Sequence, residues 1–192
     1  VNIEIENKNE FLNLKIIGNG FEGLTKPKTL LDAGNSGTTT RLMSGILASL
    51  NFETTITGDK SLNSRPMKRI IDPLSLMGAK IVSNENKAPL TFKPSQLDGI
   101  NFNMNISSAQ VKSCIMLAGL NSQSKTTISQ PSLSRDHTER MLIGMDARIK
   151  TNKLDIFIEP SKLNSVDLTI PGDISSASFW MVAAMIHPDS NI

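Results

Sequence analysis

The feature that most constrains the fold of this chain is a strand–turn–helix pattern that occurs three times. Its first copy is LDAGNSGTTTRLMSGILASL at residues 31–50: an apolar strand end, a turn of small residues, and an apolar helix. Gly37 lies 71 residues before Ser108, which lies 68 residues before Ser176, and similar turns occur at both serines. A unit of strand, helix, strand, helix and two closing strands fits this period. We therefore predict repeated α/β units whose helix N-termini approach one shared face.

Apolar spacing also predicts individual elements. Strands are expected near residues 3–5, 14–17, 53–57, 100–106 and 125–129. The helix at residues 38–50 should bury one face, formed by Leu42, Met43, Ile46, Leu47 and Leu50. Another helix should begin at Pro66, and Pro73 should kink or split it. Cys114 lies on an apolar helix face and is interpreted as a buried small hydrophobe.

Composition and charge narrow the class of protein. The chain has 192 residues, 39% of them hydrophobic and 20% charged, which is enough for one sizeable core in an ordinary soluble protein. Its net charge of +2, without a dense Lys/Arg run interleaved with aromatic residues, argues against nucleic acid as a partner. No apolar run approaches the roughly 20 residues of a membrane span. A single cysteine fits a reducing compartment, so we expect a cytoplasmic protein.

The two ends of the sequence suggest a fragment. The chain starts at Val1 rather than Met, no signal-like segment follows, and Ile192 comes just after an apolar helix. We expect neighbouring segments at both ends.

Arginine and serine residues gather where helices are predicted to start. A helix N-terminus offers free N–H groups to an anion, and arginine presents a planar fork that matches phosphate and carboxylate. Two such sites close together would suit a reaction between two anionic partners. Ordinary loops and solvated arginines remain an equally open interpretation. The residues concerned are Arg41, Arg65, Lys68, Arg69, Arg135, Ser64, Ser107, Ser108 and Ser134.

Five blocks, in order, resemble the 5-enolpyruvylshikimate-3-phosphate synthase family. They are LDAGNSGTTTRL at 31–42, GDKSLNSRPM at 58–67, SAQVKS at 108–113, SRDHTERML at 134–142 and PGDISSA at 171–177. The resemblance implies an inside-out α/β barrel (α+β) with the enolpyruvyl transferase fold, made of two domains with three repeated units each. On this basis residues 1–165 would form most of the substrate-binding domain, and residues 166–192 would begin the second domain.

The resemblance also implies an activity. The family transfers the enolpyruvyl group of phosphoenolpyruvate to the 5-hydroxyl of shikimate 3-phosphate and releases phosphate, on the route to chorismate and the aromatic amino acids. It implies no cofactor and no metal, in keeping with only two histidines and no carboxylate cluster near them. We expect the full-length protein to be a monomer, without nucleic-acid or membrane partners.

Residue roles follow from the matching blocks alone. Those that resemble phosphoenolpyruvate-binding residues are Asn35, Gly37, Thr38, Arg65 and Gln110, and a side chain at Gly37 would occupy the space of that substrate. Those that resemble shikimate 3-phosphate-binding residues are Ser108, Ala109, Gln110, Ser134 and Arg135. Ala109 stands where some members have a second serine, and His137 stands where others have tyrosine. Asp173 belongs to a family motif, but it fits a helix cap equally well.

Other family blocks have no counterpart in this chain. These are an N-terminal lysine–serine block and the acidic and basic residues of the second domain. We therefore expect no catalytic acid or base here, and we expect the 192 residues alone to be inactive. Two other functions stay open. One is a UDP-N-acetylglucosamine enolpyruvyl transferase, which the SRDHTE block and the GNSGT turn disfavour; the other is a non-catalytic domain that binds phosphorylated metabolites or a partner chain.

Overall fold

The computed structural model describes residues 2–8 and 11–191. Its strands are β1 (Asn2–Lys8), β2 (Phe11–Ile17), β3 (Leu31–Asp32), β4 (Thr54–Thr57), β5 (Lys80–Asn84), β6 (Lys87–Lys93), β7 (Asn101–Asn103), β8 (Thr126–Ser129), β9 (Ile149–Asn152) and β10 (Asp155–Ile158). Its helices are the 3₁₀ turn η1 (Phe21–Gly23), α1 (Gly37–Leu47), α2 (Lys60–Ser64), α3 (Lys68–Leu76), α4 (Ala109–Gly119), α5 (His137–Gly144) and α6 (Ile174–Ile186).

Two sheets share one topology, which confirms the predicted repeat. The first has the order β3-β4-β6-β5 and the second has the order β7-β8-β10-β9. In each sheet the first pair of strands is parallel, with a helix between them in the chain, and the other two pairs are antiparallel. Each unit therefore runs strand, helix, strand, helix and a closing hairpin. Helix α6 starts where the third copy was expected.

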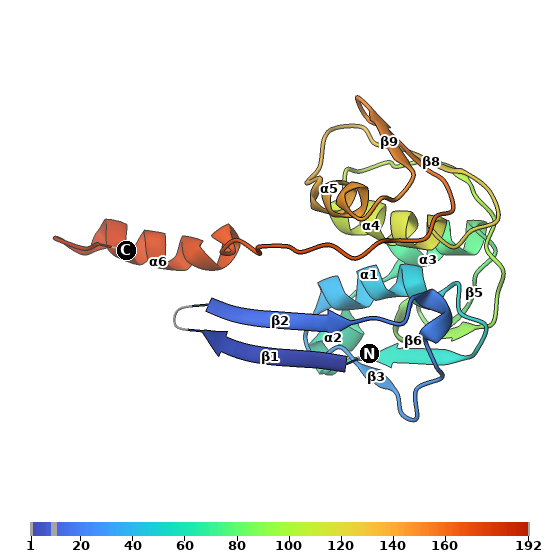
Figure 1. Cartoon of the computed structure of the whole chain (residues 1–192), viewed down its shortest axis with the longest axis horizontal. Helices are drawn as coiled ribbons and strands as arrows, with labels where there is room; N and C mark the ends of the chain where they lie inside the picture. The colour runs from blue at the N-terminus through green and yellow to red at the C-terminus, as the bar shows by residue number, and fades with distance from the viewer. Residues whose placement is uncertain (1, 9–10, 192) are drawn as a thin grey trace.

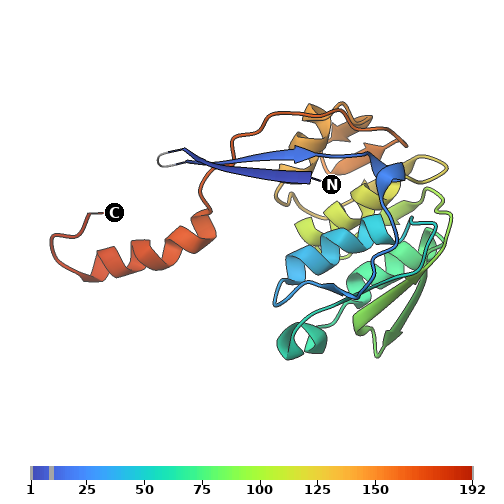
Figure 2. The ribbon, with the colours of Figure 1, turned by 60° about the horizontal axis from the view of Figure 1, so that its bottom comes forward.

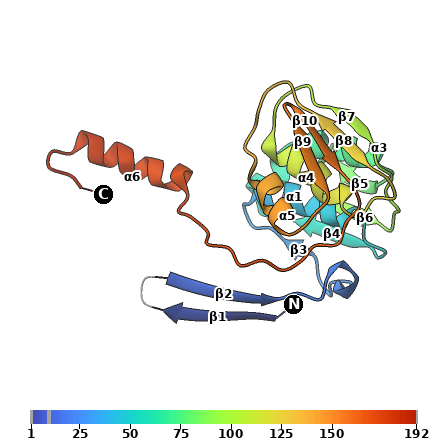
Figure 3. The same cartoon turned by 45° about the horizontal axis from the view of Figure 1, so that its top comes forward.

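Helices α1, α3 and α4 lie between the two sheets, so the centre of the body is helical and the sheets lie outside it (Figures 1 and 3). Helix α4 contacts α1 and α3 from the first unit and β8 from its own sheet. Eight of its eleven residues are buried as a result. Cys114 is one of them, as predicted, and burial raises the pKa of its thiol, which disfavours the thiolate.

Small residues let α1 and α4 approach each other closely (Figure 2). A Cβ atom added at Gly45 would lie 2.2 Å from the Cys114 carbonyl oxygen. The buried face of α1 therefore includes Thr40, Ser44 and Gly45. The predicted apolar face is only partly right: Leu47 and Leu50 are buried, whereas Leu42, Met43 and Ile46 are half-buried because α4 occupies the adjacent face.

The region around Pro66 differs from its prediction. A short helix, α2, precedes this proline, and α3 begins only at Lys68. Pro66 forms an isolated antiparallel bridge with Lys87 in the extended link between the two helices. Pro73 does not split α3, and it is buried together with Ile70 and Leu74. The strand expected at 100–106 is shorter, because only Asn101–Asn103 pairs with β8.

The hairpin of β1 and β2 and the helix α6 carry exposed apolar side chains. Both predicted N-terminal strands are present, and they pair antiparallel with each other. Helix α6 stands apart from the body in all three views, and none of its residues is buried (Figures 1 to 3). Within the described ranges, no helix has the length and apolarity needed to cross a bilayer.

The close approach of α1 and α4 predicts that a larger residue at Gly45 destabilises the fold. We expect Gly45→Ala to lower the free energy of unfolding by about 1–3 kcal/mol, because the new methyl group meets rigid backbone. Urea unfolding of this chain measures the change. Gly144→Ala in α5 is the matched control, since a Cβ there meets nothing within 4 Å and should be neutral or slightly stabilising. Equal stability of the two variants would contradict the packing described above.

Candidate active-site face

The start of α1 presents open backbone donors. Ser36 caps this helix, and its Oγ accepts a hydrogen bond of 3.0 Å from the Thr39 amide. Among the hydrogen bonds of the described residues, none uses the amides of Gly37 or Thr38 as donors. These two N–H groups and the helix dipole favour a negative charge at this end.

A carboxylate and an amide hold Arg65 beside this helix start. The Asn35 Nδ2 donates to Asp59 Oδ2 at 2.7 Å, and the Arg65 Nη2 donates to Asn35 Oδ1 at 2.6 Å. The other Asp59 oxygen caps α2 by accepting from the Leu62 amide. The Arg65 Nη2 also reaches Ser61 Oγ at 3.3 Å. Asn35 is therefore fixed at both ends of its amide and sets the direction of the Arg65 guanidinium.

Gln110 connects the two repeated units at this face. It lies in the first turn of α4, and its Nε2 donates to Thr38 Oγ1 at 2.8 Å. Its Oε1 accepts from Arg41 Nη1 at 3.0 Å. Both contacts cross from the second unit to α1, so the N-termini of α1 and α4 lie side by side.

Gly37 lies beneath two guanidinium groups. A Cβ at this position would be 3.0 Å from Arg41 Nη1 and 3.2 Å from Arg65 Nη1. Burial, followed by the charges of Arg65 and Arg69, lowers the pKa of the Arg41 guanidinium, which still remains charged near neutral pH. Hydrogen bonds from Asn35 and from the Leu62 amide hold the pKa of Asp59 below its usual value. The cluster therefore combines several fixed positive charges with one ionised carboxylate that is already hydrogen-bonded.

A depression of about 480 Å³ adjoins this cluster at the start of α4. Ser108 caps α4, with its Oγ accepting from the Val111 amide at 3.4 Å. Ser134 donates its hydroxyl to Gln130 Oε1 at 2.8 Å. The residues that line the depression are Ser107, Ser108, Ala109, Gln110, Leu133, Ser134 and Arg135.

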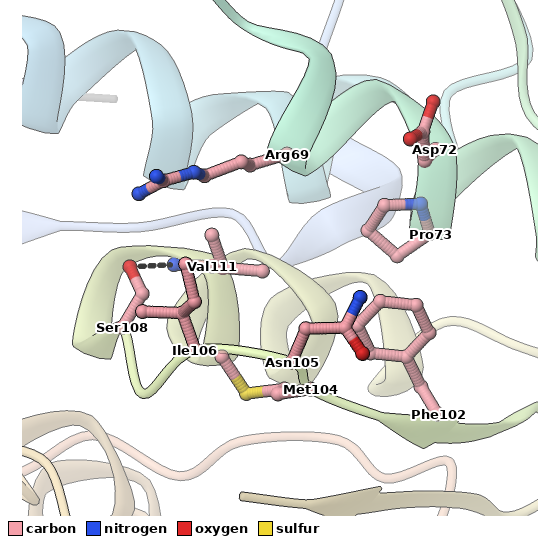
Figure 4. A pocket seen from close by; sticks show the side chains of 9 residues that line it. All are labelled: Arg69, Asp72, Pro73, Phe102, Met104, Asn105, Ile106, Ser108 and Val111. Atoms are coloured by element: carbon pink, nitrogen blue, oxygen red, sulfur yellow. Dashed lines mark hydrogen bonds between the residues drawn. The ribbon is translucent and has the colours of Figure 1, made fainter. Parts of the chain in front are cut away.

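A smaller cavity of about 200 Å³ lies between the two units (Figure 4). Helix α3 supplies Arg69, Asp72 and Pro73 on one side, and the segment from Phe102 to Val111 supplies the other side. The Arg69 side chain extends toward the Ser108 end of this cavity (Figure 4). Arg69 thereby adds a further positive charge close to both helix N-termini.

The predicted site residues fall into two adjoining groups. Asn35, Gly37, Thr38 and Arg65 gather at the start of α1, and Gln110 joins them to the other group. Ser108, Ala109, Gln110, Ser134 and Arg135 all line the depression of about 480 Å³. Their ligand roles stay predictions.

Asp173 and His137 belong to neither of these two groups. Asp173 caps α6, which stands apart from the body, and accepts from the Ser175 amide and the Ser176 hydroxyl. The hydrogen bond from the Ser176 hydroxyl is the largest of the causes that lower the pKa of Asp173. His137 is the exposed first residue of α5.

Sequence reasoning assigned no role to Asp59 and did not include Arg41 in the substrate sites. Both lie within matched motifs, but their partners are 24 and 69 residues away. No local pattern signals contacts over such separations. The described part of the chain holds no group of three or more His, Cys, Asp or Glu side chains that could bind a metal ion.

Comparisons with known proteins agree in one family. Residues 2–192 match the family model described as EPSP synthase (3-phosphoshikimate 1-carboxyvinyltransferase). A protein named 3-phosphoshikimate 1-carboxyvinyltransferase from Syntrophomonas wolfei is 49% identical over 182 residues, which are 93% of this chain and 42% of that protein. One of the same name from Coxiella burnetii strain RSA 493 is 51% identical over 93% of this chain and 41% of its own length.

Solved structures show the same likeness. EPSP synthase from Acinetobacter baumannii superposes with a TM-score of 0.85 at 42% identity, covering 95% of this chain and 42% of that one. The expected enolpyruvyl transferase fold is thereby confirmed. The chain spans about 42% of the length of the relatives it matches.

The position of Gly37 generates a prediction that needs no substrate. We expect Gly37→Ala to weaken the binding of inorganic phosphate to this chain about tenfold, because the methyl group displaces guanidinium groups that could bind the anion. The free energy of unfolding should change by less than about 1 kcal/mol, since the ends of two long side chains can move. Calorimetric titration and urea unfolding measure the two quantities, with Gly144→Ala as control. Unaltered phosphate binding would place the anion elsewhere.

Proposed function

Since the chain belongs to the EPSP synthase family, we propose that it forms part of an enzyme that transfers the enolpyruvyl group of phosphoenolpyruvate to shikimate 3-phosphate. The 5-hydroxyl of shikimate 3-phosphate is the acceptor, and phosphate is released. The chain covers about 42% of its relatives, so this activity belongs to a longer polypeptide in our proposal.

The link made by Gln110 is the observation that carries this proposal. One amide side chain contacts the first helix of the first unit while it also lines the depression of the second unit. Two anion-binding places therefore adjoin at a single residue. Such closeness is what a reaction between two bound anions requires, because their reacting atoms must meet within van der Waals distance.

We assign the start of α1 to phosphoenolpyruvate. Arg65 and Arg41 have guanidinium N–H groups, and the free amides of Gly37 and Thr38 add donors below them. Asn35 keeps Arg65 in place, as its contacts show. The absent side chain at Gly37 leaves room for a ligand against both arginines.

We assign the neighbouring depression to shikimate 3-phosphate. Ser108, Ser134 and Arg135 supply hydroxyl and guanidinium donors, and Gln110 closes the side toward phosphoenolpyruvate. Ala109 supplies no hydroxyl, so its backbone amide takes that place at the first position of α4. Ser134 must exchange its hydrogen bond to Gln130 for one to the ligand.

We place the catalytic acid and base outside this chain. The reaction needs a proton donor at the methylene carbon and a base at the attacking hydroxyl. Asp59 is the carboxylate hydrogen-bonded within the described cluster, and its lowered pKa makes it a poor proton donor and a weak base. This arrangement supports the expectation that the 192 residues bind substrates without turnover.

The remaining assignments concern the whole protein. We propose that residues 1–165 form most of one domain and that residues 166–192 begin a second. The exposed apolar surface of α6 supports the second half of this statement, because such a helix is stable when another layer covers it. We propose a cytoplasmic monomer that acts on small molecules, without a nucleic-acid partner.

Phosphate release tests the function. The complete polypeptide that contains this chain is supplied with phosphoenolpyruvate and one acceptor, either shikimate 3-phosphate or UDP-N-acetylglucosamine. We expect release with shikimate 3-phosphate alone. Release with the UDP-sugar would identify the sister transferase, and release with neither would leave a non-catalytic binding domain. The 192-residue chain, assayed in parallel, should bind without release.

Arg65 provides a sharper test of the phosphoenolpyruvate assignment. We expect Arg65→Ala to weaken phosphoenolpyruvate binding by about 2–3 kcal/mol, because a partly buried anion loses a charge-assisted pair. Affinity is measured in the complete polypeptide. Arg148→Ala removes an exposed arginine that is paired with Glu159 and should leave the affinity unchanged. An equal affinity in the Arg65 variant would remove this residue from the site.

A further inference from the structure

Two buried charged residues lie behind the turn at residues 134–136, and the proposed substrate contacts use neither of them. Lys112 comes from α4 and Glu139 from the first turn of α5. Their side chains are 0% and 6% exposed, and the Lys112 Nζ lies 2.5 Å from Glu139 Oε1. Both residues belong to blocks of the family resemblance, SAQVKS and SRDHTERML, where they had no assigned role.

The same ammonium group also holds the backbone of the turn. The Lys112 Nζ donates to the Arg135 carbonyl oxygen at 2.9 Å. The next residue along α4, Ser113, shares a hydrogen bond of 2.6 Å with Thr138. Two consecutive residues of α4 thus fix the turn and the start of α5. Arg135 lines the depression assigned to shikimate 3-phosphate, and its carbonyl oxygen accepts the hydrogen bond from Lys112.

Stability alone does not account for this pair. Removing two charges from water costs free energy that their attraction often fails to offset, and a well-packed apolar pair is frequently as stable. The Glu139 Oε2 is buried and has no hydrogen-bond partner among the described residues, so the pairing is incomplete. What an apolar pair could not supply is the donor to the Arg135 carbonyl.

We propose that Lys112 and Glu139 are positioning residues for the shikimate 3-phosphate depression. Glu139 holds the ammonium group of Lys112, and that group holds the Arg135 carbonyl. The Arg135 and Ser134 side chains are thereby kept opposite Ser108. The identity of the ligand rests on the proposed function, whereas the anchoring of the turn does not.

The test replaces both charges at once, so that neither is left unpaired. In the complete polypeptide, Lys112→Met with Glu139→Leu should keep the melting temperature close to that of the wild type. Amide hydrogen exchange at residues 134–138 should become faster by about tenfold, and the KM for shikimate 3-phosphate should rise about tenfold, since one charged hydrogen bond is lost. The KM for phosphoenolpyruvate should not change, because Arg65, Gly37 and Thr38, which are assigned to it, do not contact the turn at residues 134–138.

Two further variants complete the design. Lys15→Met with Glu4→Leu makes the same chemical change at an exposed ion pair of the N-terminal hairpin and should alter neither readout. Lys112→Gln with Glu139→Gln keeps an N–H donor in the buried position and should recover part of both effects. If the Met/Leu variant does not fold, the Gln/Gln variant gives the same two readouts.

Each outcome decides the proposal. Unchanged exchange at residues 134–138 overturns the anchoring. Faster exchange with an unchanged KM for shikimate 3-phosphate overturns the link to the substrate, and an equal rise in both KM values indicates a merely structural role. If the wild type releases no phosphate with shikimate 3-phosphate, the proposed function fails, and the exchange rates still decide the anchoring separately.

Discussion

The close packing of α1 against α4 is the contact on which the rest of the structure depends. Gly45 lets the two helices approach until a Cβ would meet the Cys114 carbonyl. At this distance the helices run side by side in the same direction, so their N-termini lie at one end of the body. Gln110 can then reach Thr38 and Arg41 across the boundary between the units. A larger residue at position 45 would separate the helices and with them the two proposed anion-binding places.

The site face is electrostatically incomplete without an anion. Arg41 lies close enough to Arg65 and Arg69 for their charges to lower its pKa, and within the described residues no carboxylate comes within 4 Å of any of these three guanidinium groups. The Asn35 amide lies between the Asp59 carboxylate and the Arg65 guanidinium and is hydrogen-bonded to both. Like charges gathered in this way cost free energy in the folded protein, and a bound phosphate or carboxylate would relieve that cost.

The repeat and the turns that open α1 and α4 could be predicted from sequence because they depend on local patterns. Small residues before an apolar run mark each turn, and both sheets follow from one repeated order of elements. The contacts that assemble the site could not be predicted, since Arg41 meets Gln110 over 69 residues and Asn35 meets Asp59 over 24. The prediction for Pro66 was wrong because its bridge with Lys87 also depends on a distant strand. The apolar face of α1 was misjudged because a small-residue face packs more closely than a large one.

Helix α4 joins these features because neighbouring residues on it point to different partners. Gln110 contacts the first unit, Lys112 and Ser113 hold the turn and the start of α5, and Cys114 faces α1. Burial on nearly every side prevents this helix from moving independently of either unit. A shift of α4 would therefore disturb contacts at both proposed substrate positions. Their relative position depends on the packing of α1 against α4 and on the two hydrogen bonds that Gln110 makes to α1.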